Sequence, residues 1–572
     1  MGKHRTGISI FIVAICLALI LPAAAFADQA TYTLSDDVKT TSRTYKIQSI
    51  EGASAITTAT AIAKKAYPSG VPSKKAIIVS SEKKAWPDAV AASSLAGALD
   101  CPILYTYEGS LPGGTANALK SLKVEQVYIV GGSKAVKPKV ADALIDKGYT
   151  VSRIWGNTFI DTQLKIYEFG KDRNIWNANT AFVATGKSYE DSLAAGTVAF
   201  RQKYPIFYVP EKGKFWKKQL TALKNSKITT FYIIGGKKAV TPTLENQLKS
   251  IADANSDKTG RNSSVERIWG WNAYTTSKYF AQWAVKNKFL SWNNTAFATG
   301  TSSLDSAPGS VLQGKTGAPI LWVADSNTQS IDALKGKGVK TLRVFGGKKA
   351  VSPFVRDEIA YTLGFKLNDI QGFKVYIDAG HGPNNTNNGA KDSGAPGCWY
   401  DKTVGFNGKD KKKGKQFYEY NETKALATSI AKKLKAQGID YYLNTDGGWY
   451  ALRHAEAISQ GCNVIVSVHF DALNGSSSGS LALYNSGGSE WSPKVAKHML
   501  TYLKKGMGLS GNARHQDVAI LRGKLPSTLL EICFIDTPGN MKKYAANEGT
   551  ASPKIAGKGK VSTQIVNGIM AL

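Results

Sequence analysis

Short, uninterrupted runs of apolar residues recur through the first two-thirds of the chain. Residues 76–79, 102–105 and 127–130 are three such runs, and small apolar residues fill the segment 89–99 between the first two. A short continuous run is typical of a strand buried on both faces, whereas the longer segment is typical of a helix. The alternation predicts right-handed βαβ crossovers and therefore α/β units, each with a parallel sheet covered by helices.

This pattern occurs three times. A Gly-Gly pair follows an apolar run at 131–132, 235–236 and 346–347, at spacings of 104 and 111 residues. Units of this length are too long for a solenoid repeat. Other signals keep the same period: Arg-Ile-Trp-Gly at 153–156 and 267–270, the weaker Ser-Ile-Glu-Gly at 49–52, and an aspartate before a small residue at Asp88, Asp191 and Asp305. The sequence therefore predicts three tandem copies of a small domain, over residues 49–152, 153–266 and 267–369.

Lysines flank the Gly-Gly pairs, at positions 134, 237, 238, 348 and 349. Glycines that follow a strand can present backbone N–H groups to a phosphate. However, the G-x-G-x-x-G spacing and the Gly-Lys-Ser/Thr of a P-loop are both missing from these turns. We interpret the pairs as tight strand-to-helix turns, and the lysines leave contact with an anionic polymer as the alternative.

Polar residues end two apolar strands in the last third of the chain. The run from Lys374 ends at His381, between two glycines, and the run from Val464 ends at His469. Open α/β sheets place functional groups at the carboxyl ends of their strands. Two neutral imidazoles with a third, oxygen ligand are typical of a zinc site that keeps its fourth position for water. For either histidine alone, an ordinary turn position is the alternative.

Carboxylates that could join the histidines lie on two other segments. Glu419 and Glu422 fall in the first turn of a predicted helix that ends at Gly438. Either one could reach the site or simply complement the helix dipole. Glu531 lies in the middle of the apolar strand 528–534, where a buried charge is costly unless it is paired or functional. We expect Glu531 to be functional, and we expect the remaining histidines outside the strand-end pattern on the surface: His454, His498 and His515.

The amino terminus and the net charge narrow the possible partners. Lys3 to Arg5 is a positive segment, residues 8–21 are apolar, and Ala25-Phe26-Ala27 fits a cleavage site. We predict a signal peptide over residues 1–27 and a linker over 28–48; an uncleaved membrane anchor is the alternative. The chain of 572 residues carries a formal net charge of +31, which favours a polyanionic partner. Export makes nucleic acid an unexpected partner and leaves an anionic wall polymer or a membrane surface.

The cysteines are too few and too widely spaced for a disulfide scaffold. Cys16 lies in the predicted signal, and Cys101, Cys398, Cys462 and Cys533 form no C-x-x-C pair. We expect them to be mostly buried small hydrophobes. One disulfide within the carboxy-terminal third stays open.

The three tandem units resemble cell-wall-binding type 2 repeats. In that family the repeats pack around a pseudo-threefold axis and attach to an anionic secondary wall polymer of Gram-positive bacteria. This resemblance implies that residues 49–369 anchor the protein to such a polymer. The chain departs from the usual R-x-x-G-x-D-R-Y-x-T opening, of which the second and third copies keep only these residues: Arg153, Gly156 and Thr162, and Arg267, Gly270 and Thr276.

Residues 372–572 resemble the zinc N-acetylmuramoyl-L-alanine amidases of the amidase type 3 family. The resemblance rests on Asp378 to Gly382, Glu419 with its helix, Leu452-Arg453, Ser467 to Ala472, and Leu529 to Glu531. It implies that Zn²⁺ is held by His381, Glu419 and His469, with Glu419 preferred over Glu422 by its distance from Gly438. It also implies that Glu531 is the catalytic carboxylate. Asp378 and Asp471 are candidates to orient the ligands through hydrogen bonds.

Together the two resemblances imply a secreted, wall-anchored peptidoglycan hydrolase. Zinc-activated water would attack the amide that joins N-acetylmuramic acid to L-alanine, with Glu531 as general base and then general acid. Two alternatives remain. A zinc peptidase acting on the stem peptide would need H-E-x-x-H or H-x-x-E near the metal, and neither occurs at His381. An inactive, S-layer-like wall protein should have lost a ligand or the glutamate, and all four residues are present.

Overall fold

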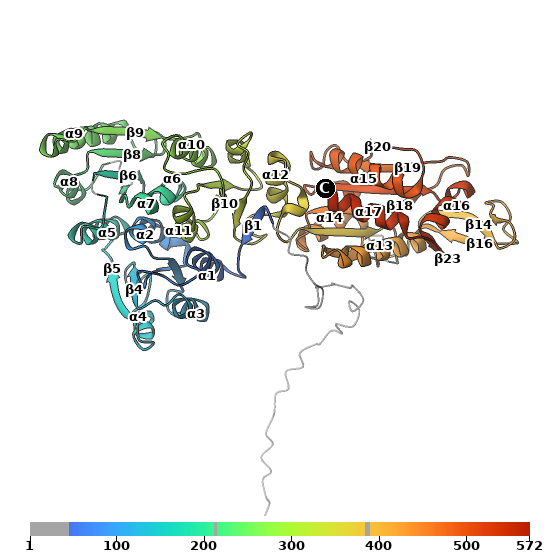
Figure 1. Ribbon diagram of the computed structural model, residues 1–572, viewed down its shortest axis with the longest axis horizontal. Helices are drawn as coiled ribbons and strands as arrows, with labels where there is room; N and C mark the ends of the chain where they lie inside the picture. Colours follow the sequence, from blue (N-terminus) through green and yellow to red (C-terminus); the bar gives the residue numbers. More distant parts are fainter. Residues whose placement is uncertain (1–44, 178, 211–213, 384–388) are drawn as a thin grey trace, which may run out of the picture.

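The computed structural model describes residues 45–177, 179–210, 214–383 and 389–572. The predicted signal peptide and most of the predicted linker lie outside these residues. Within the described ranges, none of the helices combines the length and the apolar character needed to cross a membrane. The described chain forms three small α/β units followed by a larger C-terminal α/β domain (Figure 1).

Each small unit contains one four-stranded sheet in which all neighbouring strands are parallel, as the apolar runs predict. The strand orders are β3-β2-β4-β5, β7-β6-β8-β9 and β11-β10-β12-β1. The strands are, in the first sheet, β2 (Lys75–Ser80), β3 (Ile103–Thr106), β4 (Gln126–Val130) and β5 (Thr150–Ile154); in the second, β6 (Thr180–Thr185), β7 (Ile206–Val209), β8 (Thr230–Ile234) and β9 (Ser264–Ile268); and in the third, β10 (Ala296–Thr299), β11 (Ile320–Val323), β12 (Leu342–Phe345) and β1 (Ile47–Ile50).

The strand that opens each sequence repeat completes the sheet of another repeat. β5, which holds Arg153, pairs with β4 of the first unit, and β9, which holds Arg267, pairs with β8 of the second. β1 pairs with β12, so Ile47 is the register partner of Leu342 at the far end of the repeat region. The first strand thus closes a ring of three units.

Helices rich in small residues form the centre of this ring. α2 (Trp86–Leu99), α7 (Gly196–Gln202) and α11 (Ser306–Thr316) contact one another. The approach is close, because a Cβ on Gly97 would lie 2.1 Å from the carbonyl oxygen of Phe200. The pseudo-threefold arrangement is therefore present. The other helices of the ring are α1 (Ala55–Ala66), α3 (Gly113–Ser121), α4 (Pro138–Ile145), α5 (Phe159–Asp172), α6 (Glu190–Ala194), α8 (Lys217–Lys224), α9 (Pro242–Thr259), α10 (Ala273–Lys286) and α12 (Pro353–Leu363).

The C-terminal domain is built on a six-stranded sheet of order β17-β13-β18-β21-β19-β20. All its neighbouring strands are parallel except β19 and β21, which are antiparallel. The strands are β13 (Lys374–Ala379), β17 (Asp440–Asn444), β18 (Val464–Asp471), β19 (Ser480–Tyr484), β20 (Gly511–His515) and β21 (Ser527–Phe534); the helices are α13 (Glu419–Ala436), α14 (Arg453–Ser459), α15 (Ser492–Met507), α16 (Pro538–Asn547) and α17 (Lys560–Ala571).

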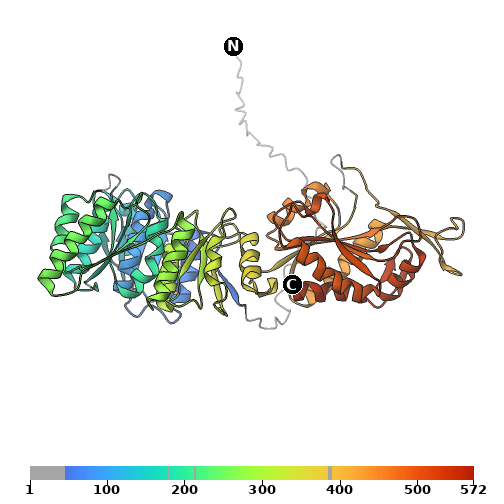
Figure 2. The same cartoon turned by 90° about the horizontal axis from the view of Figure 1, so that it is seen from above.

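Two small antiparallel sheets extend this domain. The three-stranded sheet β15-β14-β16 lies in the segment between His381 and Glu419, at the end of the molecule away from the repeats (Figures 1 and 2). Its strands, with those of the second small sheet, are β14 (Pro396–Asp401), β15 (Gly405–Phe406), β16 (Lys415–Tyr418), β22 (Gly549–Ala551) and β23 (Lys554–Ala556).

The third repeat packs directly on the C-terminal domain (Figure 2). One hydrophobic cluster runs through both, with Ile359 of α12 and Val375 of β13 among its members. The ring of Tyr361 stacks on Trp491 with centroids 4.3 Å apart, and buried Asp357 accepts a hydrogen bond from Asn463 at 3.0 Å. The junction is thus a packed interface with its own polar contacts.

Candidate metal centre

Strand ends of the C-terminal sheet bring the two predicted histidines together. His381 follows β13 with φ +68, a left-handed backbone that is uncommon outside glycine. His469 lies within β18, which continues to Asp471 past a register irregularity. A Cβ on Gly380 would lie 2.4 Å from the ring of His469, so glycine is required for the rings to approach. The two ring centroids are 4.9 Å apart.

Glu419, the first residue of α13, lies between the two imidazoles. Its Oε2 is 3.0 Å from Nε2 of His381, and its Oε1 is 2.9 Å from Nδ1 of His469. The side chain is almost fully buried, and its position is fixed by two backbone donors, the amides of Ala395 and Phe470. One ligand atom from each of the three residues lies within 4.8 Å of the others, which makes them a group that could hold a metal ion.

The other glutamate of the same helix turn points elsewhere. Glu422 is fully buried and accepts hydrogen bonds from the backbone amides of Ala551 and Ser552. Burial raises its pKa to about 7. Of the two carboxylates left open by the sequence, Glu419 therefore has the geometry of a ligand, while Glu422 holds the β22 segment against α13.

Charges reinforce one another in the cluster. Burial acts to lower the pKa of His381, but Glu419 and Asp392 outweigh it and raise that pKa to about 9. Burial acts to raise the pKa of Glu419, but the two histidines hold it far below its usual range. A carboxylate that draws positive charge between two imidazoles is the electrostatic setting of a cation site.

Glu531 lies beside the cluster on β21. It is the register partner of His469 on the neighbouring strand, so the two side chains emerge on the same face of the sheet. Its Oε2 is inaccessible to solvent and has no hydrogen-bond partner among the described residues. Burial, and then the negative charges of Glu419 and Asp471, hold the pKa of Glu531 well above its usual range.

The sequence reasoning missed a carboxylate that contacts a cluster histidine. Asp392, in the segment before β14, lies with Oδ2 2.8 Å from Nδ1 of His381. Nearby Gly394 has φ +68, and a Cβ there would lie 2.7 Å from Oε2 of Glu419. The available signal was an aspartate followed closely by glycine in a segment rich in Asn, Gly and Lys. No periodic pattern points such a loop back toward β13.

The two aspartates suggested as orienting partners have other contacts. Asp378 is buried and accepts hydrogen bonds from Nη1 of Arg453 at 2.7 Å and from the hydroxyl of Ser467. Arg453 in turn donates to the backbone carbonyl of His381 at 3.0 Å, so Asp378 acts on the histidine's backbone through an arginine. Asp471 accepts from the amide of Ala472, and burial raises its pKa.

The expectations for the remaining histidines are partly wrong. His515 is exposed and His498 is half-buried. His454, however, is only 4% exposed; its Nδ1 is 3.0 Å from the carbonyl oxygen of Ile520, and its Nε2 accepts from the amide of Leu525. It is a core histidine because the loop around Gly523 folds over its ring, a long-range contact that local pattern does not reveal.

The expectation for the cysteines is confirmed. Cys101, Cys398, Cys462 and Cys533 are all buried and free, so the disulfide that the sequence left open does not form.

The donor set fits zinc. Two imidazole nitrogens and one carboxylate oxygen are ligand types that zinc takes at catalytic sites. On the adjacent strand, Glu531 has a buried carboxylate oxygen for which the described part of the chain provides no hydrogen-bond donor, as suits a group that handles protons beside the metal. The glycines at 380 and 394 leave space next to His469, His381 and Glu419 that a larger residue would fill.

Comparison with known proteins agrees with both halves of the molecule. Residues 375–569 match the family described as N-acetylmuramoyl-L-alanine amidase, and residues 49–141, 153–245 and 267–356 each match cell wall binding domain 2. The chain therefore joins three cell wall binding repeats to an N-acetylmuramoyl-L-alanine amidase domain.

Similar proteins match this chain over different shares of its length. The chain is 24% identical over 509 residues to N-acetylmuramoyl-L-alanine amidase LytC of Bacillus subtilis (strain 168), which covers 87% of this chain and 90% of that protein. It is 25% identical over 296 residues to the amidase enhancer of the same organism, covering 51% of this chain and 37% of that protein. The solved structure of Cwp6 from Clostridium difficile shares the fold, with a TM-score of 0.50 and 22% identity over 94% of this chain and 82% of that one. The protein is thus a cell-wall-associated amidase that acts on peptidoglycan.

Proposed function

We propose that this amidase is exported by a Gram-positive bacterium, held on the wall by an anionic polymer, and dependent on Zn²⁺ bound by His381, Glu419 and His469. The proposal assigns residues 1–27 to a cleaved signal peptide, 49–369 to wall binding and 372–572 to catalysis. The observation that carries it is the cluster itself: two imidazoles and a buried carboxylate converge beside Glu531. The net charge of +31 supports an anionic polymer as anchor.

Each residue has a separate task in the proposed reaction. Zn²⁺ bound at this cluster would lower the pKa of a water molecule and polarise the carbonyl oxygen of the substrate. Glu419 fixes the spacing of the two histidines, since one of its oxygens faces each ring. Asp392 holds the Nδ1 side of His381, which leaves Nε2 directed at Glu419.

Glu531 carries the protons. Its carboxylate takes a proton from the attacking water while the water oxygen adds to the carbonyl carbon of the lactyl amide. The same carboxyl group then gives the proton to the nitrogen of L-alanine as the C–N bond breaks. Burial and the nearby negative charges raise the pKa of Glu531, and a raised pKa favours the second step, in which the carboxyl group donates its proton.

Product analysis tests the reaction. Purified sacculi are digested with the full chain, and mass spectrometry identifies the new termini. We expect free L-alanine amino termini and intact glycan strands; release of D-alanine would show a carboxypeptidase instead. Glu531→Gln should keep its zinc by elemental analysis and lose activity by roughly 10²–10⁴-fold. Full activity in that variant would contradict the role of Glu531.

A further inference from the structure

The three Gly-Gly turns share a backbone conformation and a hydrogen bond from an arginine. The first glycine has φ +116, +111 and +89 in the three copies, at Gly131, Gly235 and Gly346. An arginine donates to the carbonyl of each: Arg153 to Gly131 at 2.9 Å, Arg267 to Gly235 at 2.8 Å, and Arg356 to Gly346 at 2.8 Å. In the third copy this arginine comes from α12, because Ser49 stands at the usual position. The arginines therefore shape the turns, and Arg267 and Arg356 also pair with Glu245 and Glu51.

The surroundings of the third turn are closed by the amidase domain. Nζ of Lys348 donates to the carbonyl oxygens of Gly372 and Gly461, at 2.9 and 2.5 Å. Glu51 stands where the other two copies have tryptophan, and it lies 3.5 Å from Arg356. The lysine that follows the third glycine pair thus holds the catalytic domain and is not free for an external ligand.

The same turn in the second repeat borders an open hollow of about 620 Å³. Trp269 lies against Gly236, and the neighbouring Trp271 is 84% exposed, with the two ring centroids 5.2 Å apart. Lys237 and Lys238 line the hollow and are exposed. A ligand that covers the apolar face of this exposed indole would lower the free energy, so the ring favours a contact surface here.

Carboxylates complete the lining. Glu190 and Asp191 also line the hollow, and Oε2 of Glu190 is buried with no hydrogen-bond donor among the described residues. The hollow therefore combines two indole rings, two exposed lysines and two carboxylates.

The first repeat has a reduced version of this site. Trp155 is 49% exposed and lies against Gly132, and Lys134 follows the turn. Ser133 replaces the first lysine, and Asn157 stands in the place of Trp271. One stacking face and one cation remain.

We propose that the hollow beside Gly235-Gly236 is the main binding site for an acidic polysaccharide, that the first repeat holds a weaker copy, and that the third turn serves to hold the amidase domain. Trp269 and Trp271 would cover the apolar faces of sugar rings, and Lys237 and Lys238 would pair with phosphate or carboxylate groups. This inference rests on the proposed attachment to an anionic wall polymer and adds where that polymer binds.

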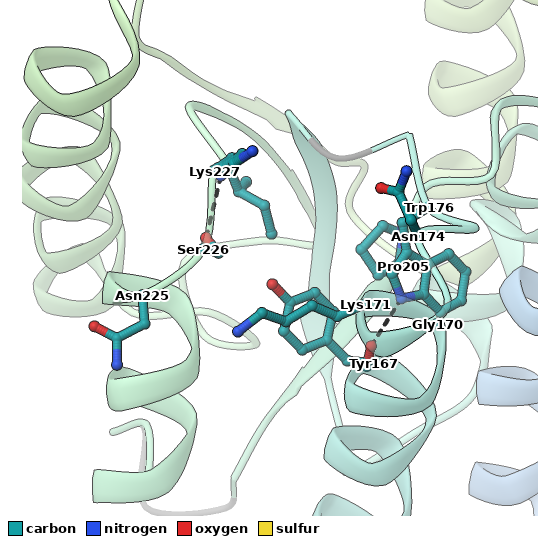
Figure 3. Close-up of a pocket in the computed structure, with 10 residues that line it drawn as sticks. Tyr167, Gly170, Lys171, Asn174, Trp176, Pro205, Asn225, Ser226 and Lys227 are labelled. Atoms are coloured by element: carbon teal, nitrogen blue, oxygen red, sulfur yellow. Dashed lines mark hydrogen bonds between the residues drawn. The ribbon is translucent and has the colours of Figure 1, made fainter.

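Figure 3 shows a second hollow of the same repeat, whose lining includes Pro205 and Ile228, just before β7 and β8, and which therefore lies at the opposite, amino edge of the sheet. It measures about 260 Å³, and its lining includes Tyr167, Trp176, Lys171 and Lys227. Its indole is turned inward, since Nε1 of Trp176 donates to the carbonyl oxygen of Tyr167 at 2.8 Å and the ring is buried. With no exposed stacking face among its lining residues, this hollow provides a matched control on the same repeat.

The test measures binding of the full chain to purified sacculi that carry their anionic polymers, by co-sedimentation at 4 °C. The main variant is Trp271→Ala with Lys237→Ala and Lys238→Ala, all exposed positions that leave the fold intact. We expect its apparent Kd to rise at least about tenfold, which corresponds to about 1.4 kcal/mol. Trp155→Ala with Lys134→Ala should raise it about threefold. Two controls, Lys349→Ala in the third repeat and Lys171→Ala with Lys227→Ala at the amino edge, should bind like the wild type.

Sacculi treated with hydrofluoric acid, which removes phosphodiester-linked polymers, separate the possible failures. Wild-type binding that survives this treatment would overturn an acidic polymer as the ligand and, with it, the proposed anchoring. Polymer-dependent binding that the main variant keeps would overturn only the location in the second repeat. A loss of equal size in Lys349→Ala or in the amino-edge control would show a diffuse charge effect and would likewise overturn the site. Hydrolysis of soluble muropeptides should be unchanged in the two control variants, Lys349→Ala and Lys171→Ala with Lys227→Ala.

Discussion

The repeats and the amidase domain place polar groups at the same edge of sheets whose neighbouring strands are all or mostly parallel, yet among the described residues a candidate metal centre forms only in the amidase domain. Each repeat has an aspartate beneath its Gly-Gly turn, at Asp88, Asp191 and Asp305. The amidase domain has two histidines and a glutamate at the corresponding edge. All described histidines lie in the amidase domain, so the repeats offer oxygen and cationic groups but no imidazole. The architecture supplies the edge, and the residue types decide its chemistry.

Removing an imidazole should produce the largest effect. We expect His469→Ala to lose its bound zinc and to lose activity by at least about a thousandfold, because two of the three proposed ligands cannot hold the ion. Elemental analysis and a sacculus digestion assay measure the two effects. His515→Ala, at an exposed position, is the control. Full zinc content in His469→Ala would show that His469 is not needed to hold the metal, and would contradict the centre proposed at the edge of the amidase sheet.

The two glutamates of α13 sharpen the contrast further. We expect Glu419→Gln to weaken zinc binding about a hundredfold and to lose most activity, since both oxygens face histidines. Glu422→Gln should keep zinc and activity, because its amide oxygen can still accept from Ala551 and Ser552. Competition with a chromogenic chelator gives the affinities. Weaker zinc binding in Glu422→Gln than in Glu419→Gln would identify Glu422 as the ligand instead.

Stability should show that the amidase edge also depends on an internal ion pair. Arg453→Met leaves Asp378 buried with Ser467 as its remaining partner, and we expect a loss of about 3–5 kcal/mol in urea unfolding. The exposed pair between Arg522 and Asp517 provides the comparison, and Arg522→Met should cost less than about 1 kcal/mol. Equal losses of stability in Arg453→Met and Arg522→Met would mean that burial does not make the first ion pair more important than the exposed one.

The aspartates of the repeats should be visible in the pH dependence of stability. Burial raises the pKa of Asp305 to about 6, from an ordinary value of 3.8. A folded-state pKa above the unfolded one means that this group favours folding below about pH 4, and the advantage is lost as the pH rises through 6. Relative to the wild type, Asp305→Asn should therefore gain stability between pH 4 and 7, by at most about 3 kcal/mol.

Urea unfolding curves recorded at several pH values measure that gain in stability. Asp88→Asn and Asp191→Asn should behave alike, because burial raises both pKa values to about 6 as well. A difference between variant and wild type that stays constant with pH would contradict the burial argument.

The smallest expected effect concerns Asp392. Losing the negative charge at Nδ1 of His381 in Asp392→Asn should weaken zinc binding by about tenfold, while the structure stays intact. Asp401→Asn, on the neighbouring β14, is the control. Zinc affinity equal to that of the wild type would show that the contact does not orient the histidine.

Regular elements could be predicted where local pattern and tertiary environment agree. The apolar runs at 76–79 and 127–130 lie within β2 and β4, and the helix from Glu419 ends before Gly438, as expected. Contacts made by irregular loops could not be predicted. Asp392 reaches His381 from a segment without periodicity, and His454 is buried by a loop about seventy residues away in sequence.

The sequence by itself determined which parts this protein has. These are three copies of a βα unit, a net charge that favours polyanions, and two histidines and a glutamate at or near the strands of the last third. These features follow from periodicity and residue chemistry, which are local. Tertiary structure decided the pairing of β1 with β12, the use of Arg356 in place of a missing arginine, and the engagement of Lys348 by the amidase domain. Nearly identical turns at 235–238 and 346–349 thus have different surroundings, because the partners of a side chain are set by distant segments that only folding brings together.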